Sequence, residues 1–246
     1  MAPTTVDGLD IDDATIDGTE VSEITVDGNV VFKAGPDIPD SEVYLQDDWG
    51  DNRLTDREDS GTTTYNGVEG VYRPEWELAN AFNNLPTVSN ERLQLTDDDE
   101  GIVTEINLNL DETVTWEFTG IDVSNSGTGG GDTAHFGLWA EQQDSQFVGR
   151  LEESYTVSVR NGDSVRLEKM DGDGNFDDFI DGSSISGSDH SVTVTRTPSG
   201  EWELFVDGSS DGTATDTELL DPVFAYFSAR QDDRTVDITL DEVKVN

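Results

Sequence analysis

The stretch from His190 to Gly208 constrains the fold of this 246-residue chain more than any other segment. It reads HSVTVTRTPSGEWELFVDG, with apolar and polar residues alternating on both sides of Pro198-Ser199-Gly200. A period of two places alternate side chains on opposite faces of a β-strand. The residues expected on the buried face are Val192, Val194, Trp202, Leu204 and Val206. Asp207-Gly208 suits the positive φ angles of a tight turn. The segment therefore predicts an antiparallel hairpin with one face in a core.

Similar alternation recurs along the chain between glycine-rich turns. It is found at Ile106–Leu110, Val114–Phe118, Ala134–Ala140, Tyr155–Val159, Val165–Leu167 and Val223–Ala229. Residues 58–100 are rich in loop formers, and only Arg92–Leu95 suggests a short strand there. Trp76–Phe82 is the one segment whose apolar spacing resembles a helix. Many short strands predict an all-β protein, an antiparallel β-sandwich of jelly-roll type.

The first 35 residues differ from the rest of the chain because Asp-Gly pairs recur every ten residues, at 7–8, 17–18 and 27–28. Val21–Val26 and Asn29–Phe32 flank the third pair and predict a small N-terminal β-hairpin module. An isolated hairpin is marginally stable, so it should pair with the sandwich, a second copy or another protein. The apolar residues expected to anchor or oligomerise it are Val21, Ile24, Val26, Val30 and Phe32. We expect a module over 1–35, a stiff linker over 36–42 and the sandwich over 43–246.

Charge limits the classes of partner. Asp and Glu number 55 against 13 Lys and Arg, a formal charge of -42. Such a chain lacks the basic patch that a protein needs to bind nucleic acids or anionic membranes. A self-repelling surface is tolerable where salt screens it, which predicts adaptation to very high salt. No apolar run approaches the roughly 20 residues of a membrane-spanning helix, and we expect neither membrane insertion nor a secretory signal.

Four segments resemble parts of known families. The His190–Gly208 hairpin, the closing run Val236–Val245 and the segment Asp47–Arg57 resemble concanavalin A-like and laminin G-like domains. That resemblance implies two packed antiparallel sheets, on a scaffold that serves lectins, adhesion modules, hydrolases and lyases. The segment Ile16–Phe32 resembles the N-terminal part of structural proteins, such as turrets, spikes and fibres, from haloarchaeal tailed viruses. The alternative is an ordinary hairpin that caps the sandwich edge.

The segment Asp171–Asp178, DGDGNFDD, is the best candidate for a metal site. Ca²⁺ prefers six to eight oxygen ligands, and this spacing offers side-chain oxygens at alternate positions of one loop. The candidate ligands are Asp171, Asp173, Asn175 and Asp177. The segment lacks the closing glutamate of an EF-hand loop, since Gly182 stands there, and an acidic hairpin tip is the alternative interpretation.

Aromatic and basic residues on the face opposite the core suggest a glycan-binding groove. Sugar rings pack on aromatic planes, while charged and amide groups bind their hydroxyls. If the strands of residues 134–140 and 223–229 are neighbours, then His135, Trp139, Tyr226 and Arg230 line one groove. The alternative is that either face of these strands belongs to the core, since both carry aromatic residues.

Catalytic motifs were not found. Glycoside hydrolysis needs paired carboxylates, and the E-x-D-x-x-E run of laminarinase-like members of the fold is absent, as is the Q-I-H triplet of its alginate lyases. Two histidines, no cysteine and no G-x-S-x-G leave little for nucleophilic catalysis. We therefore expect a protein without enzymatic activity.

These observations support three hypotheses. The first is a virion surface protein of a halophilic tailed virus, a capsid turret, spike or tail fibre, that forms a homo-oligomer. Its N-terminal module would bind other virion proteins, and its sandwich would bind a host glycan or glycoprotein. The second is a polysaccharide-active enzyme or carbohydrate-binding module, extracellular in a halophilic archaeon. The third is an adhesion module without a small-molecule site.

Overall fold

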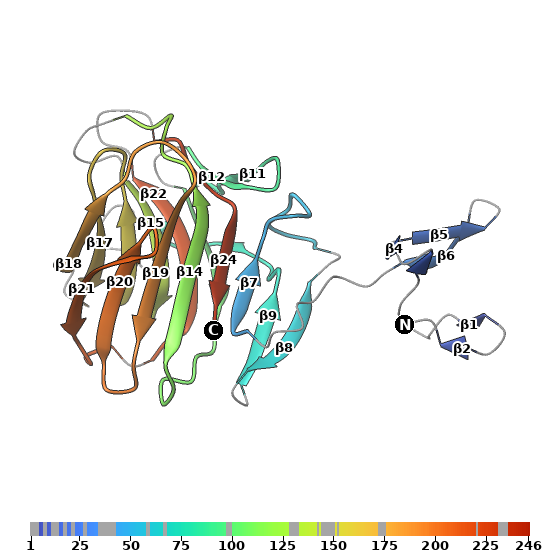
Figure 1. Ribbon diagram of the computed structural model, residues 1–246, viewed down its shortest axis with the longest axis horizontal. Coiled ribbons are helices and arrows are strands. Elements are labelled where there is room, and N and C mark those ends of the chain that lie inside the picture. Colours follow the sequence, from blue (N-terminus) through green and yellow to red (C-terminus); the bar gives the residue numbers. More distant parts are fainter. Residues whose placement is uncertain are drawn as a thin grey trace. The chain divides into compact units, whose positions relative to one another are not determined.

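The computed structural model describes two compact units, residues 1–40 and 41–246 (Figure 1). The described residues are the strands of the first unit and, in the second, 43–57, 60–65, 68–96, 100–127, 133–141, 143, 151, 153–171, 176–219, 221–230 and 236–246. Only the backbone is described for the first unit, for 63–65 and for Phe176. Within these ranges the secondary structure is entirely β, and no helix has the length and apolarity to cross a membrane.

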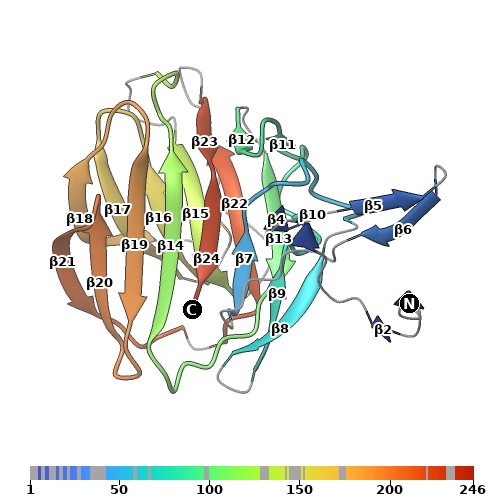
Figure 2. The same ribbon diagram turned by 45° about the vertical axis from the view of Figure 1, so that its right-hand side comes forward.

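The second unit is a sandwich of two large sheets, as the alternation predicts (Figures 1 and 2). The eight-stranded sheet has the order β21 (Ser209–Thr215), β20 (Glu201–Val206), β19 (His190–Arg196), β14 (Val114–Ile121), β24 (Glu242–Val245), β7 (Leu45–Asp47), β9 (Val68–Tyr72) and β8 (Gly61–Tyr65). The seven-stranded sheet has the order β10 (Glu77–Leu78), β13 (Gly101–Glu105), β22 (Phe224–Arg230), β15 (Thr133–Ala140), β16 (Ser154–Val159), β17 (Ser164–Met170) and β18 (Phe176–Ser184). A small third sheet joins β11 (Thr87–Val88), β12 (Leu93–Leu95) and β23 (Ile238–Leu240). Among the named strands, pairing is antiparallel except between β7 and β9.

The central hairpin is confirmed. β19 pairs with β20 in the expected register, opposing Val192 to Val206 and Val194 to Leu204. All the residues expected on its inner face are buried. Asp207 and Gly208 have φ angles of 49° and 75°, so the tight turn is also as predicted.

The core consists of side chains from the facing sides of the two large sheets. Trp116 and Trp202 come from the eight-stranded sheet and contact Trp139 of the seven-stranded sheet, with ring centroids 5.7 and 5.4 Å apart. A second aromatic group joins Phe118, Phe136 and Phe227. Large rings packed at these distances account for much of the apolar area that a sandwich removes from water.

Three expectations about local structure were wrong. Trp76–Phe82 contains the two-residue strand β10 and turns instead of a helix. Ile106–Leu110 lies beyond the end of β13, although Ile106 and Leu108 are buried. Strands β8 to β11 lie in the region that was expected to consist mostly of loops. The alternation of apolar and polar residues does not reveal these strands, because segments such as GTTTY in β8 carry few apolar residues.

The first unit contains three two-stranded sheets: β1 (Thr5–Val6) with β2 (Leu9–Asp10), β3 (Thr15–Ile16) with β4 (Thr19–Glu20), and β5 (Glu23–Val26) with β6 (Asn29–Lys33). Each pair flanks one Asp-Gly of the ten-residue repeat, and each Asp-Gly follows Thr and then Val or Ile. The hairpin expected around the third Asp-Gly pair is therefore present in the backbone. The same signal identifies the other two strand pairs, which the sequence interpretation missed.

Candidate functional site

The glycan groove expected on the seven-stranded sheet is not an open surface. His135, Trp139 and Tyr226 have no exposed side-chain surface, and Arg230 is half-buried. Trp139 lies in the core because the register between β15 and its neighbours shifts after Gly137. A bulge of this kind breaks the alternation and turns the side chain to the other face. The predicted role of Trp139 is therefore corrected to core packing.

Tyr226 and His135 lie on the face opposite the core, as expected, but they are covered. Tyr226 belongs to a small apolar cluster with Phe82 and Val103, and its ring lies directly over Gly137. Its hydroxyl is 3.3 Å from Ser154 Oγ. The structure thus places Trp139 in the core, His135 and Tyr226 on the covered opposite face, and Arg230 at the end of β22.

The predicted calcium loop lies partly outside the described residues, since Asp173 and Asn175 fall there. Asp171 is half-buried, and Asp177 is exposed on β18 opposite Lys169. No group of three or more His, Asp or Glu side chains suited to a metal ion occurs in the described ranges. The Ca²⁺ site stays a prediction.

The expected anchor residues are placed only by their backbone. Ile24 and Val26 lie on β5, and Val30 and Phe32 lie on β6, with Ile24 opposite Phe32. Val21 lies outside the described residues. Their role in oligomerisation stays a prediction.

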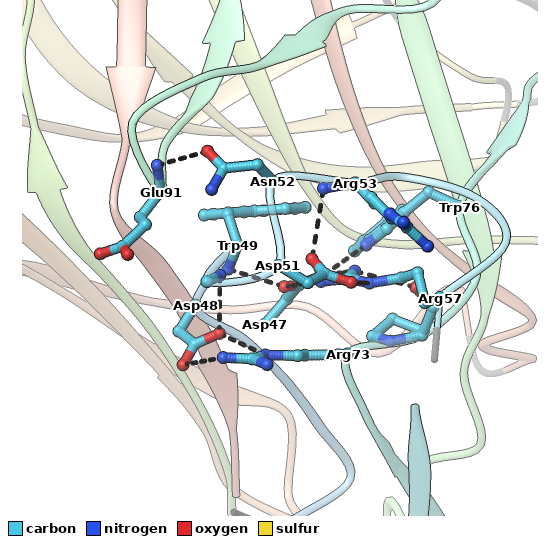
Figure 3. A network of polar contacts seen from close by, with 12 residues as sticks. Asp47, Asp48, Trp49, Asp51, Asn52, Arg53, Arg57, Arg73, Trp76 and Glu91 are labelled. Atoms are coloured by element: carbon cyan, nitrogen blue, oxygen red, sulfur yellow. Dashed lines mark hydrogen bonds and ion pairs between the residues drawn. The ribbon is translucent and has the colours of Figure 1, made fainter. Parts of the chain in front are cut away.

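A polar network organises the segment after β7 (Figure 3). Asp47 is fully buried, and its carboxylate pairs with the Arg57 guanidinium through both oxygens. The same carboxylate accepts hydrogen bonds from Trp76 Nε1 at 2.7 Å and from the Trp49 backbone N–H at 2.9 Å. Burial raises the pKa of Asp47, while the Arg57 and Trp76 donors favour its charged form. Because the Asp47 oxygens are hydrogen-bonded to several donors, this buried ion pair can hold the loop in one conformation.

Arg57 in turn ties the loop to its surroundings. Its Nε and Nη2 donate to the two Asp51 oxygens at 2.8 and 2.7 Å, and its Nη1 also donates to the Pro74 carbonyl at 3.1 Å. The guanidinium fork has five donors, and all five have acceptors here. The loop from Asp47 to Arg57 is therefore held by side chains rather than by a strand ladder.

An open polar cavity of about 490 Å³ lies beside this network. We call it the polar cavity. Its lining residues are Asp48, Gly50, Arg73, Asn90, Glu91, Arg92, Thr119, Asp241 and Glu242. They come from the loop after β7, the residue after β9, the β11–β12 turn, β14, and the β23–β24 turn with the first residue of β24. Carboxylates, guanidinium groups, an amide and a hydroxyl therefore converge from five parts of the chain.

Two ion pairs orient the charged groups of the polar cavity. Arg73 donates to both oxygens of Asp48, at 2.7 and 3.0 Å, and Arg92 Nε donates to Asp241. Burial opposes ionisation of Asp48, but the Arg73 hydrogen bonds and charge outweigh it and lower the Asp48 pKa. Hydrogen bonding to Asp241 raises the Arg92 pKa. Asp48, Arg73 and Arg92 therefore stay charged at neutral pH and present fixed donors and acceptors.

Backbone strain is concentrated around the polar cavity. Trp49, Asn52, Arg73, Asn90 and Glu91 all have positive φ angles, between 46° and 61°. A non-glycine residue in this region costs of order 1–3 kcal/mol, and such residues cluster at functional sites. The Asn52 side chain accepts a hydrogen bond from the Glu91 N–H at 2.8 Å, so the strained β11–β12 turn is docked on the strained loop (Figure 3).

The geometry defines the class of the fold, an antiparallel β-sandwich of jelly-roll type. No protein-family model matches the chain, and no curated protein sequence matches it. Solved structures do match. The carbohydrate recognition domain of Emp47p is 14% identical with a TM-score of 0.53, and the match covers 69% of this chain and 87% of that domain. The carbohydrate recognition domain of Emp46p in its potassium-bound form is 14% identical with a TM-score of 0.51, over the same shares of the two chains. At such identity the likeness establishes the fold.

Proposed function

We propose that this chain is a non-enzymatic virion surface protein of a halophilic tailed virus, and that its sandwich binds host-surface glycan or glycoprotein through the polar cavity. The observation that carries the glycan role is the cavity itself, in which rigid ion pairs and strained turns hold donors and acceptors in place. Fixed carboxylate, amide and guanidinium groups match the hydroxyls of a sugar. The Emp46p and Emp47p domains of similar fold are carbohydrate recognition domains, which agrees with this proposal.

The volume of the polar cavity, about 490 Å³, falls within the range of about 300–1,000 Å³ that small-molecule sites occupy. Four of its nine lining residues are acidic and two are basic, and both arginines are paired. An acidic lining in a chain of formal charge -42 repels anionic sugars. The polar cavity therefore suits a neutral glycan better than one rich in carboxylates or sulfates.

The N-terminal unit supports the virion role. Two-stranded hairpins are marginal in water unless they pair with something larger. Three of them at a ten-residue period suit repeated pairing with further copies of the chain, in a homo-oligomer, or with other virion proteins. The charge of -42 suits a particle that circulates in concentrated salt, where the Debye length is about 3 Å at 1 M. The same features support the proposal of a turret, spike or tail fibre at the virion surface.

Calcium remains part of the proposal. Asp171, Asp173, Asn175 and Asp177 supply the oxygen ligands that Ca²⁺ prefers. Emp46p has been solved both potassium-bound and metal-free, so a domain of this fold can exist with and without a cation. Calorimetric titration with Ca²⁺ of the native chain and of Asp173→Asn tests the loop. Equal heats for the two proteins, or no heat, would remove calcium from the proposal.

A glycan array at molar salt tests the binding role. We expect retention of neutral glycans and no release of reducing ends. Thr119→Val removes one hydroxyl from the polar cavity, and Glu91→Gln removes one charge and replaces an acceptor oxygen by an NH₂ donor. Each should weaken retention about tenfold, the equivalent of 1.4 kcal/mol. Thr193→Val and Glu201→Gln make the same chemical changes elsewhere on the eight-stranded sheet and should change retention less than about twofold. An empty array contradicts glycan binding, and equal effects of the two sets of variants contradict the assignment of the site.

Sedimentation and labelling test the virion role separately. The full chain should sediment as an oligomer at molar salt, and a chain lacking residues 1–35 should sediment as a smaller species. Antibodies against the sandwich should label intact particles. A monomeric full chain together with unlabelled particles would contradict the virion role while leaving glycan binding open.

A further inference from the structure

A groove lies between β9 of the eight-stranded sheet and β13 of the seven-stranded sheet, because residues of both strands line it. The two strands are labelled in Figure 2. It consists of two cavities, of about 390 and 450 Å³, that share Val71 and Glu105 as lining residues. None of their lining residues belongs to the polar cavity. We call this continuous surface the edge groove.

The floor of the edge groove is apolar. Val71, Ile106, Val223 and Phe224 line it, and Val71, Val223 and Phe224 are only half-buried. Half-exposed apolar side chains gathered in a groove gain free energy when another apolar surface covers them. The floor therefore favours an occupant with apolar side chains.

The rim of the edge groove is acidic. Glu69, Glu75, Glu77 and Glu105 are all exposed and line one or both cavities. No lysine or arginine occurs among the lining residues of either cavity. The negative charges at this rim complement an occupant that carries lysine or arginine. Direct contacts between these opposite charges persist at molar salt, because salt screens mainly the interactions between charges that lie farther apart.

The edge groove also offers a free backbone edge. β10 covers β13 only opposite Ile102 and Val103. The Ile106 N–H bonds to the Val223 carbonyl of the neighbouring chain segment, so the backbone groups of the preceding residue, Glu105, point the other way. In the part of the chain that the structure describes, no strand pairs with Glu105 on that side. An extended segment in the edge groove can therefore form main-chain hydrogen bonds with Glu105, the last residue of β13.

We propose that the edge groove binds an extended segment of a different protein, in which apolar residues alternate with lysine or arginine. Alternation places the apolar side chains on the floor and the basic side chains at the glutamate rim. Residues 1–40 of this chain fit poorly, because they contain ten acidic residues and a single basic one, Lys33. Charge thus favours a foreign partner over a second copy.

Peptide titration tests this proposal with the full chain at molar potassium chloride. The probe is a labelled ten-residue peptide that alternates valine and lysine, and its control has the same composition with the lysines gathered at one end. We expect the alternating peptide to bind at least tenfold more tightly by fluorescence anisotropy. Proline at its centre, which removes a main-chain donor, should weaken binding about tenfold if the peptide pairs with β13.

Variants separate groove binding from general attraction to an acidic protein. Glu77→Gln with Glu105→Gln should weaken the alternating peptide at least tenfold, and Glu112→Gln with Glu201→Gln removes the same charge elsewhere and should change it less than twofold. All four side chains are exposed, so the variants should stay folded, which circular dichroism verifies. Equal binding of the two peptides, or equal effects of the two double variants, would overturn the proposal. Glycan retention by the polar cavity should be unchanged in both double variants.

Discussion

Replacing Asp47 by asparagine tests how the loop beside the polar cavity is held. The carboxylate is fully buried and accepts hydrogen bonds from Arg57, Trp76 and the Trp49 backbone. Asparagine keeps the shape but removes the charge and points an NH₂ group at donors. Removing one partner of a buried ion pair costs about 3–5 kcal/mol. Arg57 keeps its bonds to Asp51, so we expect the lower end, about 3 kcal/mol.

Urea unfolding at constant molar salt measures this change, because urea leaves ionic strength unaltered. In thermal unfolding of a domain of this size, a loss of about 3 kcal/mol lowers the midpoint temperature by about 6–12 °C. The matched control is Asp48→Asn, since Asp48 pairs with Arg73 but its side chain is 37% exposed. A pair exposed to that degree contributes about 1 kcal/mol or less. If the Asp47 variant loses no more stability than the Asp48 variant, the buried pair is not what holds the loop.

Three further predictions concern the sandwich itself. A Cβ on Gly137 would lie 1.9 Å from Tyr226 Cδ1, so Gly137→Ala should lower the free energy of unfolding in urea by about 1–3 kcal/mol. Adding Tyr226→Leu should recover part of this loss, and strictly additive effects of the two substitutions would show that the side chains do not clash. Burial lowers the pKa of His190, but hydrogen bonds to Asp207 and the Ser186 carbonyl outweigh it and leave the pKa raised. This stabilisation should be complete below the unfolded pKa of about 6.5 and disappear as pH rises through the folded value, and a folded pKa at or below 6.5 by NMR would contradict it. Transfer from molar salt to about 0.1 M lengthens the Debye length to about 10 Å, so the acidic residues of a chain with charge -42 repel one another over a longer range. The unfolding midpoint should therefore fall, and an unchanged midpoint would show that self-repulsion does not limit stability.

The features that sequence alone predicted correctly depend on short-range periodicity. Val192, Val194, Trp202 and Leu204 face the core because a strand alternates faces with a period of two, and burial selects the apolar face. The turn at Asp207 was predictable because few residue pairs accept positive φ angles. Asp-Gly pairs mark the N-terminal hairpins for the same reason.

The candidate functional surfaces depend on tertiary structure. The polar cavity joins Asp48 to Glu242, almost 200 residues apart, and no local pattern records that meeting. The sequence of the segment after β7 resembles domains of this fold, but the ion pair between Asp47 and Arg57 depends on where the chain returns after the loop. Strands β8 to β11 were missed because pairing with neighbours, rather than their own apolar content, holds them in place.

Trp139 marks the boundary between the two kinds of information. Local alternation assigns it to the face opposite Phe136, yet one register shift after Gly137 turns it into the core beside Trp116 and Trp202. A side chain's face follows from its position along a regular strand, and that position changes wherever the pairing slips by one residue. Sequence thus determined the layers and turns of this protein. Strand pairing and loop convergence, which depend on residues far apart in the chain, decided which groups are left at its surface.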